Sequence, residues 1–72
     1  MKTNMSIKVG KNLKQARLDK GLTQKEIASE FHFTQQQYSR FETGLFELNY
    51  EQVDKICKLL DITPNELYGY DF

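Results

Sequence analysis

The sequence is poor in the residues that build disulfide frameworks, metal sites and membrane spans. Its 72 residues include one Cys, one Pro, one His and no Trp. A single Cys excludes an internal disulfide and a multi-cysteine metal site. The N-terminal stretch MKTNMSIKVGKN has no long apolar run, which argues against a signal peptide and a membrane span. We therefore expect a cytoplasmic protein without a metal, a cofactor or a membrane partner.

Basic and acidic side chains are equal in number but unevenly distributed. Residues 1–25 hold seven Lys/Arg and one acid, a net charge of +6, whereas residues 26–72 hold three Lys/Arg and nine acids, a net charge of −6. This asymmetry suggests that one end of the molecule meets phosphate while the other faces away. Two solvated halves explain the charges equally well, so charge alone does not decide. A chain this short forms one small domain, for which a dimer would add stability.

The stretch Thr23–Glu42 predicts two short helices joined by a tight turn. Thr23 and Glu26 have the spacing of a capping box, in which each side chain bonds the other residue's backbone N–H. Thr34 and Gln37 repeat the arrangement at the start of the second helix. Two short helices in this order are typical of a helix-turn-helix, whose second helix reads DNA.

The second helix of this unit opens on three glutamines, Gln35, Gln36 and Gln37. Gln can pair through two hydrogen bonds with the adenine edge in the major groove. Gln is also a good helix former, so a solvated helix face is the alternative. His32 stands at the turn, where a positive φ is expected and His is tolerated. Because no second ligand or nucleophile lies near His32, we favour this turn role over catalysis or metal binding.

The rest of the chain also reads as helical, without any β pattern. Ser6 is expected to cap the first helix and Gly21 to end it. The expected helices cover residues 7–20, 24–31, 35–43, 50–60 and a short last helix with Pro64 at its first position. Asn49 with Gln52 and Thr63 with Glu66 have the spacing of two further capping boxes, at the starts of the last two helices. These five helices predict a compact all-α domain over residues 7–68, with a flexible N-terminus (1–6) and a C-terminal tail (69–72).

Two further positions carry specific expectations. Gly10 lies inside the first helix, where Gly usually indicates close packing. Cys57 shares one apolar stripe of the fourth helix with Val53, Ile56 and Leu60, so these residues are expected in the core and the thiol is expected to be buried and reduced. No nucleophile–base pair, metal cluster or phosphate loop is visible, and we do not expect an enzyme.

The chain resembles the Cro/repressor type (XRE-like) of helix-turn-helix domain, similar to lambdoid phage repressors. The resemblance covers roughly Val9 to Leu67 and implies a five-helix, lambda-repressor-like DNA-binding fold with the helix-turn-helix at its second and third helices. Its markers are Val9-Gly10, Arg17, Gly21-Leu22-Thr23-Gln24, Ile27-Ala28, Phe33-Thr34, Arg40, Glu42-Thr43-Gly44 and Ile62-Thr63-Pro64-Asn65-Glu66-Leu67.

The resemblance implies a role for each matching residue. Bases would be read by Gln35, Gln36 and Arg40, with Arg40 suited to guanine or, alternatively, to a phosphate. The other recognition-helix residues would be Thr34, Gln37 and Ser39. Phosphate contacts would come from Thr23, Gln24, Lys25 and Thr43, since a helix N-terminus offers free N–H groups and a positive dipole end. Arg17 and Glu42 would form a structural ion pair that ties the first helix to the third.

Two features depart from the family pattern. His32 replaces the usual Gly of the turn, and the loop after Gly44 reads Leu45-Phe46-Glu47 where many relatives place Lys or Arg. Leu45 and Phe46 could both be dimer contacts, or one of them could simply cover the core. We favour core cover for Leu45 and a dimer contact for Phe46. The apolar tail residues Tyr68, Tyr70 and Phe72 could serve a dimer or fold back on the first helix.

These observations favour a sequence-specific DNA-binding transcriptional regulator. We expect a repressor that binds a palindromic operator in double-stranded DNA as a homodimer, with its reading helices in successive major grooves. The alternative is an antitoxin or accessory protein whose main partner is another protein, bound through the acidic second half and the apolar tail.

Overall fold

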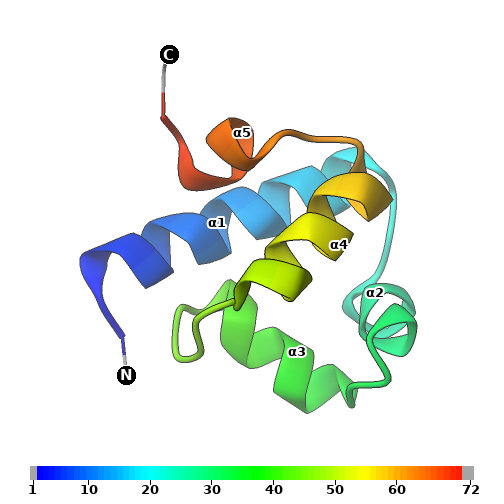
Figure 1. Cartoon of the computed structure of the whole chain (residues 1–72). Helices are drawn as coiled ribbons and strands as arrows, with labels where there is room; N and C mark the ends of the chain where they lie inside the picture. Colours follow the sequence, from blue (N-terminus) through cyan, green and yellow to red (C-terminus); the bar gives the residue numbers. More distant parts are fainter. Residues whose placement is uncertain (1, 71–72) are drawn as a thin grey trace.

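Five helices make up the computed structural model, which describes residues 2–70 (Figure 1). They are α1 (Asn4–Asp19), α2 (Gln24–Glu30), α3 (Gln35–Glu42), α4 (Tyr50–Leu60) and α5 (Pro64–Tyr68). Within residues 2–70 there is no strand, so the predicted all-α fold is confirmed. In Figure 1, α2 and α3 form the lower edge of the molecule and α5 the opposite side, with α1 and α4 between them.

Helix starts follow the capping pattern expected from the sequence. A complete capping box opens each of α2, α3, α4 and α5, with N-cap residues Thr23, Thr34, Asn49 and Thr63. Removing such a cap typically costs ~1 kcal/mol. Thr3 and Ser6 form the same box in α1, so a local signal marks where each of the five helices begins, before any long-range contact is considered.

The start predicted for the first helix is wrong. We expected Ser6 to cap a helix beginning at Ile7, but α1 begins at Asn4 and its N-cap is Thr3. Ser6 is instead the third helical residue, and its hydroxyl also donates to the carbonyl oxygen of Gly44 over 2.7 Å. Ser6 is therefore buried against the end of α3, because its hydroxyl satisfies a carbonyl that the loop would otherwise leave unbonded.

The core forms where one face of each helix meets the others. Its buried hydrophobic residues are Leu13, Ile27, Ala28, Tyr38, Phe41, Val53, Ile56, Cys57, Leu60 and Leu67. Gly10 lets α1 approach α3 closely, as predicted, because a Cβ at Gly10 would lie 2.4 Å from the Glu42 carbonyl oxygen. The expectation of a buried, free thiol at Cys57 is also confirmed.

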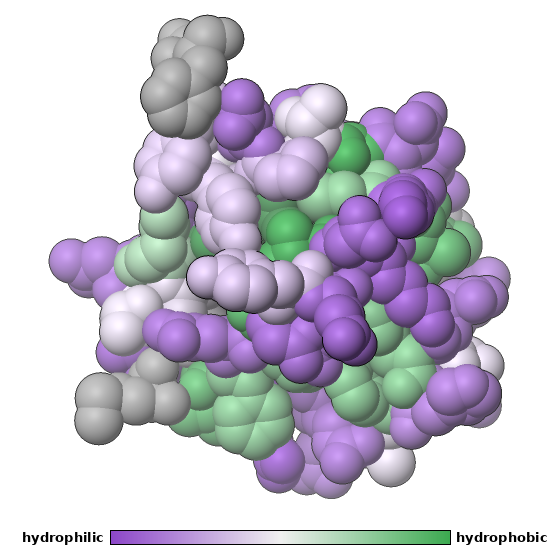
Figure 2. All heavy atoms as spheres, viewed as in Figure 1, coloured by the Kyte–Doolittle hydropathy of each residue, from purple (hydrophilic) through white to green (hydrophobic). Residues whose placement is uncertain are grey.

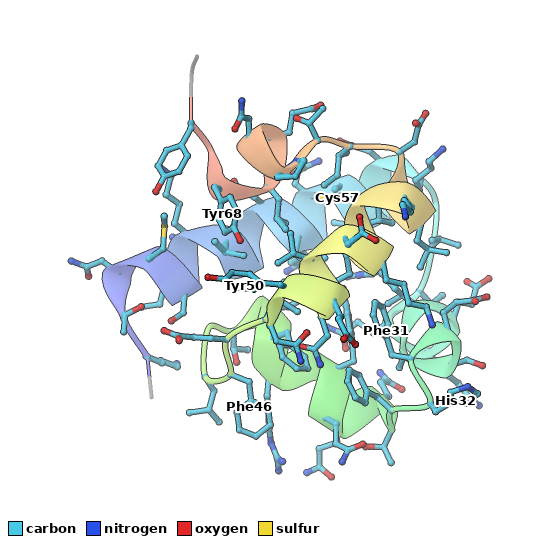
Figure 3. The ribbon with its side chains drawn as sticks, viewed as in Figure 1. Phe31, His32, Phe46, Tyr50, Cys57 and Tyr68 are labelled. Atoms are coloured by element: carbon cyan, nitrogen blue, oxygen red, sulfur yellow. The ribbon has the colours of Figure 1, made fainter. Side chains whose placement is uncertain are left out.

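The turn between α2 and α3 has the predicted backbone conformation. His32 has a φ of +58°, in the left-handed region that few non-glycine residues adopt. Its side chain is exposed and projects from the corner between the two helices (Figure 3). This single left-handed residue reverses the chain, so that Phe33 packs against the core and α3 starts at once.

The last helix folds back on the first. Asn12 of α1 donates its side-chain amide to the carbonyl oxygen of Leu67 over 2.9 Å. Tyr70 lies beside Lys8, whose ammonium nitrogen is 5.8 Å from the ring centre. The tail was predicted either to serve a dimer or to fold back on the first helix, and Tyr68 and Tyr70 contact the domain itself. Phe72 lies outside the described residues. None of the helices within residues 2–70 has the length and apolar content that crossing a bilayer requires.

Candidate nucleic-acid interface

One side of α3 is buried and the other faces solvent. Tyr38 and Phe41 point into the core, with 1% and 8% of their surfaces exposed. The side chains of Gln35, Gln36 and Gln37 are exposed, and those of Ser39 and Arg40 are partly exposed. The outer face of α3 therefore presents amides, a hydroxyl and a guanidinium, and it contains no carboxylate, because the helix's one acid, Glu42, is buried.

An aromatic array holds the two helices of the unit in position. The ring of Phe33 stacks on Phe31 at the end of α2 and on Phe41 in α3, with ring centres 5.5 Å apart in both pairs. Aromatic pairs of this kind add about 0.5–1.5 kcal/mol beyond the area they bury. The orientation of α3 relative to α2 is thus set by side chains from both helices and from the turn.

A buried ion pair joins α1 to the end of α3. The Arg17 Nε donates to Glu42 Oε2 over 2.6 Å and its Nη2 donates to Oε1 over 3.3 Å, while Nη1 donates to the Leu22 carbonyl over 2.7 Å. Only 8% and 3% of the Arg17 and Glu42 side chains are exposed. The ion pair that the family resemblance implies is therefore present in this chain, and both of its side chains are buried.

The sequence did not reveal that Gln24 extends this pair towards the recognition helix. Its Nε2 donates to Glu42 Oε1 over 2.9 Å, and its Oε1 accepts a longer hydrogen bond of 3.5 Å from Gln35 Nε2. A chain of hydrogen bonds thus runs from Arg17 through Glu42 and Gln24 to Gln35. No local sequence pattern predicts this hydrogen-bond chain, since Gln24 and Glu42 are 18 positions apart. Gln24 is partly buried, and its amide is already engaged on both sides.

The surroundings of the ion pair shift its pKa values. Burial raises the pKa of Glu42, but hydrogen bonds from Arg17 and Gln24 outweigh that effect and leave the pKa below its usual range. The hydrogen bond to Glu42 raises the pKa of Arg17, against the opposing effect of burial. Burial also raises the pKa of Tyr38, with a further contribution from the Glu42 charge. The Tyr38 hydroxyl lies beside this pair, but it makes no hydrogen bond of ordinary geometry to the described residues.

Arg40 is held by the segment that follows α3. Its carbonyl accepts hydrogen bonds from the N–H groups of Leu45 and Phe46, over 2.9 and 3.1 Å, and from the Thr43 hydroxyl over 3.2 Å. Its guanidinium carbon lies over the Phe46 ring, 5.5 Å from the ring centre. The rings of Phe46 and Phe41 in turn form a T-shaped pair, with their centres 5.8 Å apart and an angle of 69° between their planes. The contact between Phe46 and Arg40 was not predicted from the sequence.

The remaining predicted contact residues lie at two places. Thr23, Lys25 and Thr43 are exposed near the two ends of the helix-turn-helix. Phe46 and Tyr68 line a groove of about 210 Å³ together with Met5, Ser6, Val9, Phe41, Glu47, Leu48 and Val53. Figure 2 shows apolar atoms at the lower edge of the face in view, where Figure 3 labels Phe46. Within residues 2–70, no group of three or more His, Cys, Asp or Glu side chains is placed so that it could hold a metal ion.

Comparison with known proteins identifies the family. Residues 13–67 match the family described as helix-turn-helix, so the chain belongs to that family of DNA-binding regulatory domains, in its XRE-type branch. This match confirms the predicted resemblance.

A relative within this family is similar over most of the chain. The sequence is 32% identical over 63 residues to the antitoxin PezA of Streptococcus pneumoniae serotype 4 (strain ATCC BAA-334 / TIGR4). The alignment covers 88% of this chain and 40% of that protein, so the chain spans less than half the length of its relative. No solved structure matches the chain at a significant level.

Proposed function

We propose that this chain is a sequence-specific DNA-binding transcriptional regulator, a repressor that occupies a palindromic operator as a dimer. The observation that carries the proposal is the outer face of α3, where exposed Gln35 and Gln36 stand at the first turn and Arg40 lies one turn later. A helix of this kind fits the major groove, which exposes a distinct donor and acceptor pattern for each base pair. Family membership independently supports DNA binding.

The chemistry of the three side chains suggests which bases they read. The amides of Gln35 and Gln36 can each form two hydrogen bonds with adenine, and Arg40 can bind guanine through O6 and N7. Each good pair of this kind discriminates by about 1–3 kcal/mol against the wrong base. The hydrogen bond from Gln35 to Gln24 orients the amide of Gln35 before DNA arrives. Thr34, Gln37 and Ser39 complete the helix surface, and the capping bond already engages the amide oxygen of Gln37.

The phosphate backbone would be held beside the reading helix. Lys25 offers an exposed ammonium group, Thr23 an exposed hydroxyl and Gln24 the second N–H of its amide. The Thr43 hydroxyl donates to the Arg40 carbonyl and would exchange that bond for one to phosphate. The loop after α3 contributes no basic side chain, so we expect fewer phosphate contacts and a correspondingly small salt dependence. Two copies would set their α3 helices about 34 Å apart, one helical turn of DNA. We propose that Phe46, Tyr68 and Tyr70 contribute to the contact between copies.

Selection of bound duplexes from a random pool at physiological salt tests the proposal. We expect a pseudopalindromic site with two half-sites about one turn apart. Gln36→Ala should relax base preference at one position of each half-site. Lys25→Ala should weaken binding to every sequence about equally and reduce the salt slope by about 1. Lys25 is a cleaner phosphate probe than Gln24, because Gln24 also contacts Glu42 and Gln35. Unchanged base preference in Gln36→Ala would remove it from the reading face.

A second candidate function is that of an antitoxin or accessory protein with a protein partner. The observation that favours it is the similarity to a protein named as an antitoxin. Co-expression with the product of the adjacent gene tests this candidate. It is supported by a stable complex of the two purified chains together with relief of growth arrest, and separate elution of the two chains without relief contradicts it. DNA binding and a protein partner are compatible with each other.

A further inference from the structure

We propose that Phe46 is a positioning residue that holds the Arg40 guanidinium ready for base reading. This inference rests on the proposed function, because it concerns how one of the proposed reading side chains is oriented. The proposal assigns a role to the loop after Gly44, Leu45-Phe46-Glu47, which departs from the family pattern because it has no basic side chain.

The first argument is that Phe46 is itself fixed. Its ring makes a T-shaped contact with the ring of Phe41, which is buried and stacked on Phe33. The ring is nevertheless 41% exposed, so it is a surface platform anchored to the core. In Figure 3 it projects from the loop beyond α3, at the same edge of the molecule as α3 itself. An aromatic side chain has two rotatable bonds, and a contact with a buried ring limits them.

The second argument is that the backbone holds Phe46 and Arg40 in register. The N–H groups of Leu45 and Phe46 both donate to the Arg40 carbonyl, and the Thr43 hydroxyl donates to the same oxygen. The segment after α3 therefore folds back on the backbone of Arg40, and its Phe46 ring contacts the Arg40 side chain. These bonds fix where the Phe46 side chain starts relative to Arg40, and the ring meets the guanidinium at 5.5 Å.

The third argument concerns what kind of partner suits a reading arginine. A carboxylate would orient Arg40 by taking up one or two of its five N–H donors, which leaves fewer of them for guanine. Within residues 2–70 no carboxylate lies within ion-pair distance of Arg40. An aromatic ring attracts the guanidinium through its electron-rich face and uses none of those donors. Phe46 can thus restrict the side chain of Arg40, reducing the ordering cost on binding, while leaving its hydrogen-bonding capacity for DNA.

A binding experiment on a single half-site tests the inference. The duplex carries one half-site from the selected operator, so that one copy binds and contacts between copies do not contribute. The measured quantity is the ratio of affinities for guanine and for a substituted base at the position where Arg40→Ala abolishes the preference. We expect Phe46→Leu to reduce this ratio by about twofold to fivefold, the size of an exposed cation–π contact. Phe46→Tyr, which keeps the ring, should retain the parental ratio.

A double-mutant comparison separates orientation from general destabilisation. Phe46→Leu should have no further effect on base preference when Arg40 is already Ala, because no guanidinium remains to be held. Circular dichroism and thermal unfolding establish that each variant is folded. If Phe46→Leu does not fold, Phe46→Met supplies an unbranched apolar side chain without a ring for the same comparison.

The outcomes distinguish this inference from the function on which it rests. If Arg40→Ala leaves base preference unchanged at every position, the proposed reading role of Arg40 fails and the inference fails with it. If Arg40→Ala abolishes a guanine preference that Phe46→Leu leaves intact, the inference alone is overturned. If Phe46→Leu weakens binding to the full operator and leaves half-site binding unchanged, Phe46 is a contact between copies and does not position Arg40.

Discussion

Replacing Glu42 by Ala should remove most of the folding stability of this chain. The Glu42 carboxylate accepts hydrogen bonds from Arg17 Nε and Nη2 and from Gln24 Nε2, at 2.6, 3.3 and 2.9 Å. Truncation leaves a guanidinium that is 8% exposed without its carboxylate. One of the three Arg17 contacts, to the Leu22 carbonyl, would remain.

The magnitude follows from the burial of the pair. Breaking a buried ion pair by removing one partner costs roughly 3–5 kcal/mol, because the other charge is left uncompensated. A single small core rarely supplies more than ~3–5 kcal/mol of net stability, so the variant should lie close to the unfolding threshold. For a domain of this size each kcal/mol shifts Tm by about 4–8 °C, and a decrease of roughly 12 °C or more is expected.

Urea unfolding followed by circular dichroism measures the effect, with Asp54→Ala as a matched control. Asp54 also pairs with a cation, Lys58 at 3.0 Å, but these side chains are 67% and 77% exposed. Because solvent screens an exposed pair, the control should change the unfolding free energy by no more than about 1 kcal/mol. Equal losses in Glu42→Ala and Asp54→Ala would refute the reasoning, as would a loss below about 1 kcal/mol in Glu42→Ala. Replacing Arg17 by Met and Glu42 by Leu together should cost less than Glu42→Ala, since no buried charge is then stranded.

Three further predictions follow from single residues. Folding lowers the pKa of Glu42, so its contribution is present above the unfolded-state value of about 4.3 and is lost as the pH falls through the folded-state pKa. The stability difference between the parent and Glu42→Gln should therefore shrink below about pH 4.3, and a difference that stays constant to about pH 3 would contradict the assignment. Gly10→Ala should destabilise the chain by about 1–3 kcal/mol in urea unfolding, because the new Cβ meets a backbone carbonyl at 2.4 Å, and parental stability would show that α1 and α3 are not so close. Burial, with smaller contributions from Asp54 and Glu66, raises the pKa of the Cys57 thiol. A thiol reagent should consequently modify the native chain much more slowly than the urea-unfolded chain, whereas equal rates would argue against a buried Cys57.

Much of the fold was predictable because its signals are local. The four predicted capping boxes each involve residues three positions apart, and all four are present. The positive φ at His32 followed from the need for a sharp reversal between two capped helices. The apolar stripe of the fourth helix placed Val53, Ile56, Cys57 and Leu60 in the core, where the structure has them.

The predictions that failed or fell short concern side chains with two potential partners. Ser6 has the residue type of an N-cap, but Thr3 offers the same chemistry three positions earlier, and the loop after α3 uses the Ser6 hydroxyl. Gln24 was interpreted as a phosphate ligand alone, yet its amide contacts Glu42 and Gln35. Choosing between such partners requires the distance between segments far apart in the sequence, which periodicity does not contain.

The sequence by itself determined the five-helix pattern, the helix-turn-helix and the polar character of the outer face of α3, because helical periodicity and capping depend on residues within one or two turns of one another. Tertiary structure alone decided how that face is held. The hydrogen-bond chain from Arg17 to Gln35 and the contact of Phe46 with Arg40 exist because packing brings α1, α2, α3 and the following loop together. Residue types specify which contacts a side chain can make, and the packed core specifies which of them it makes.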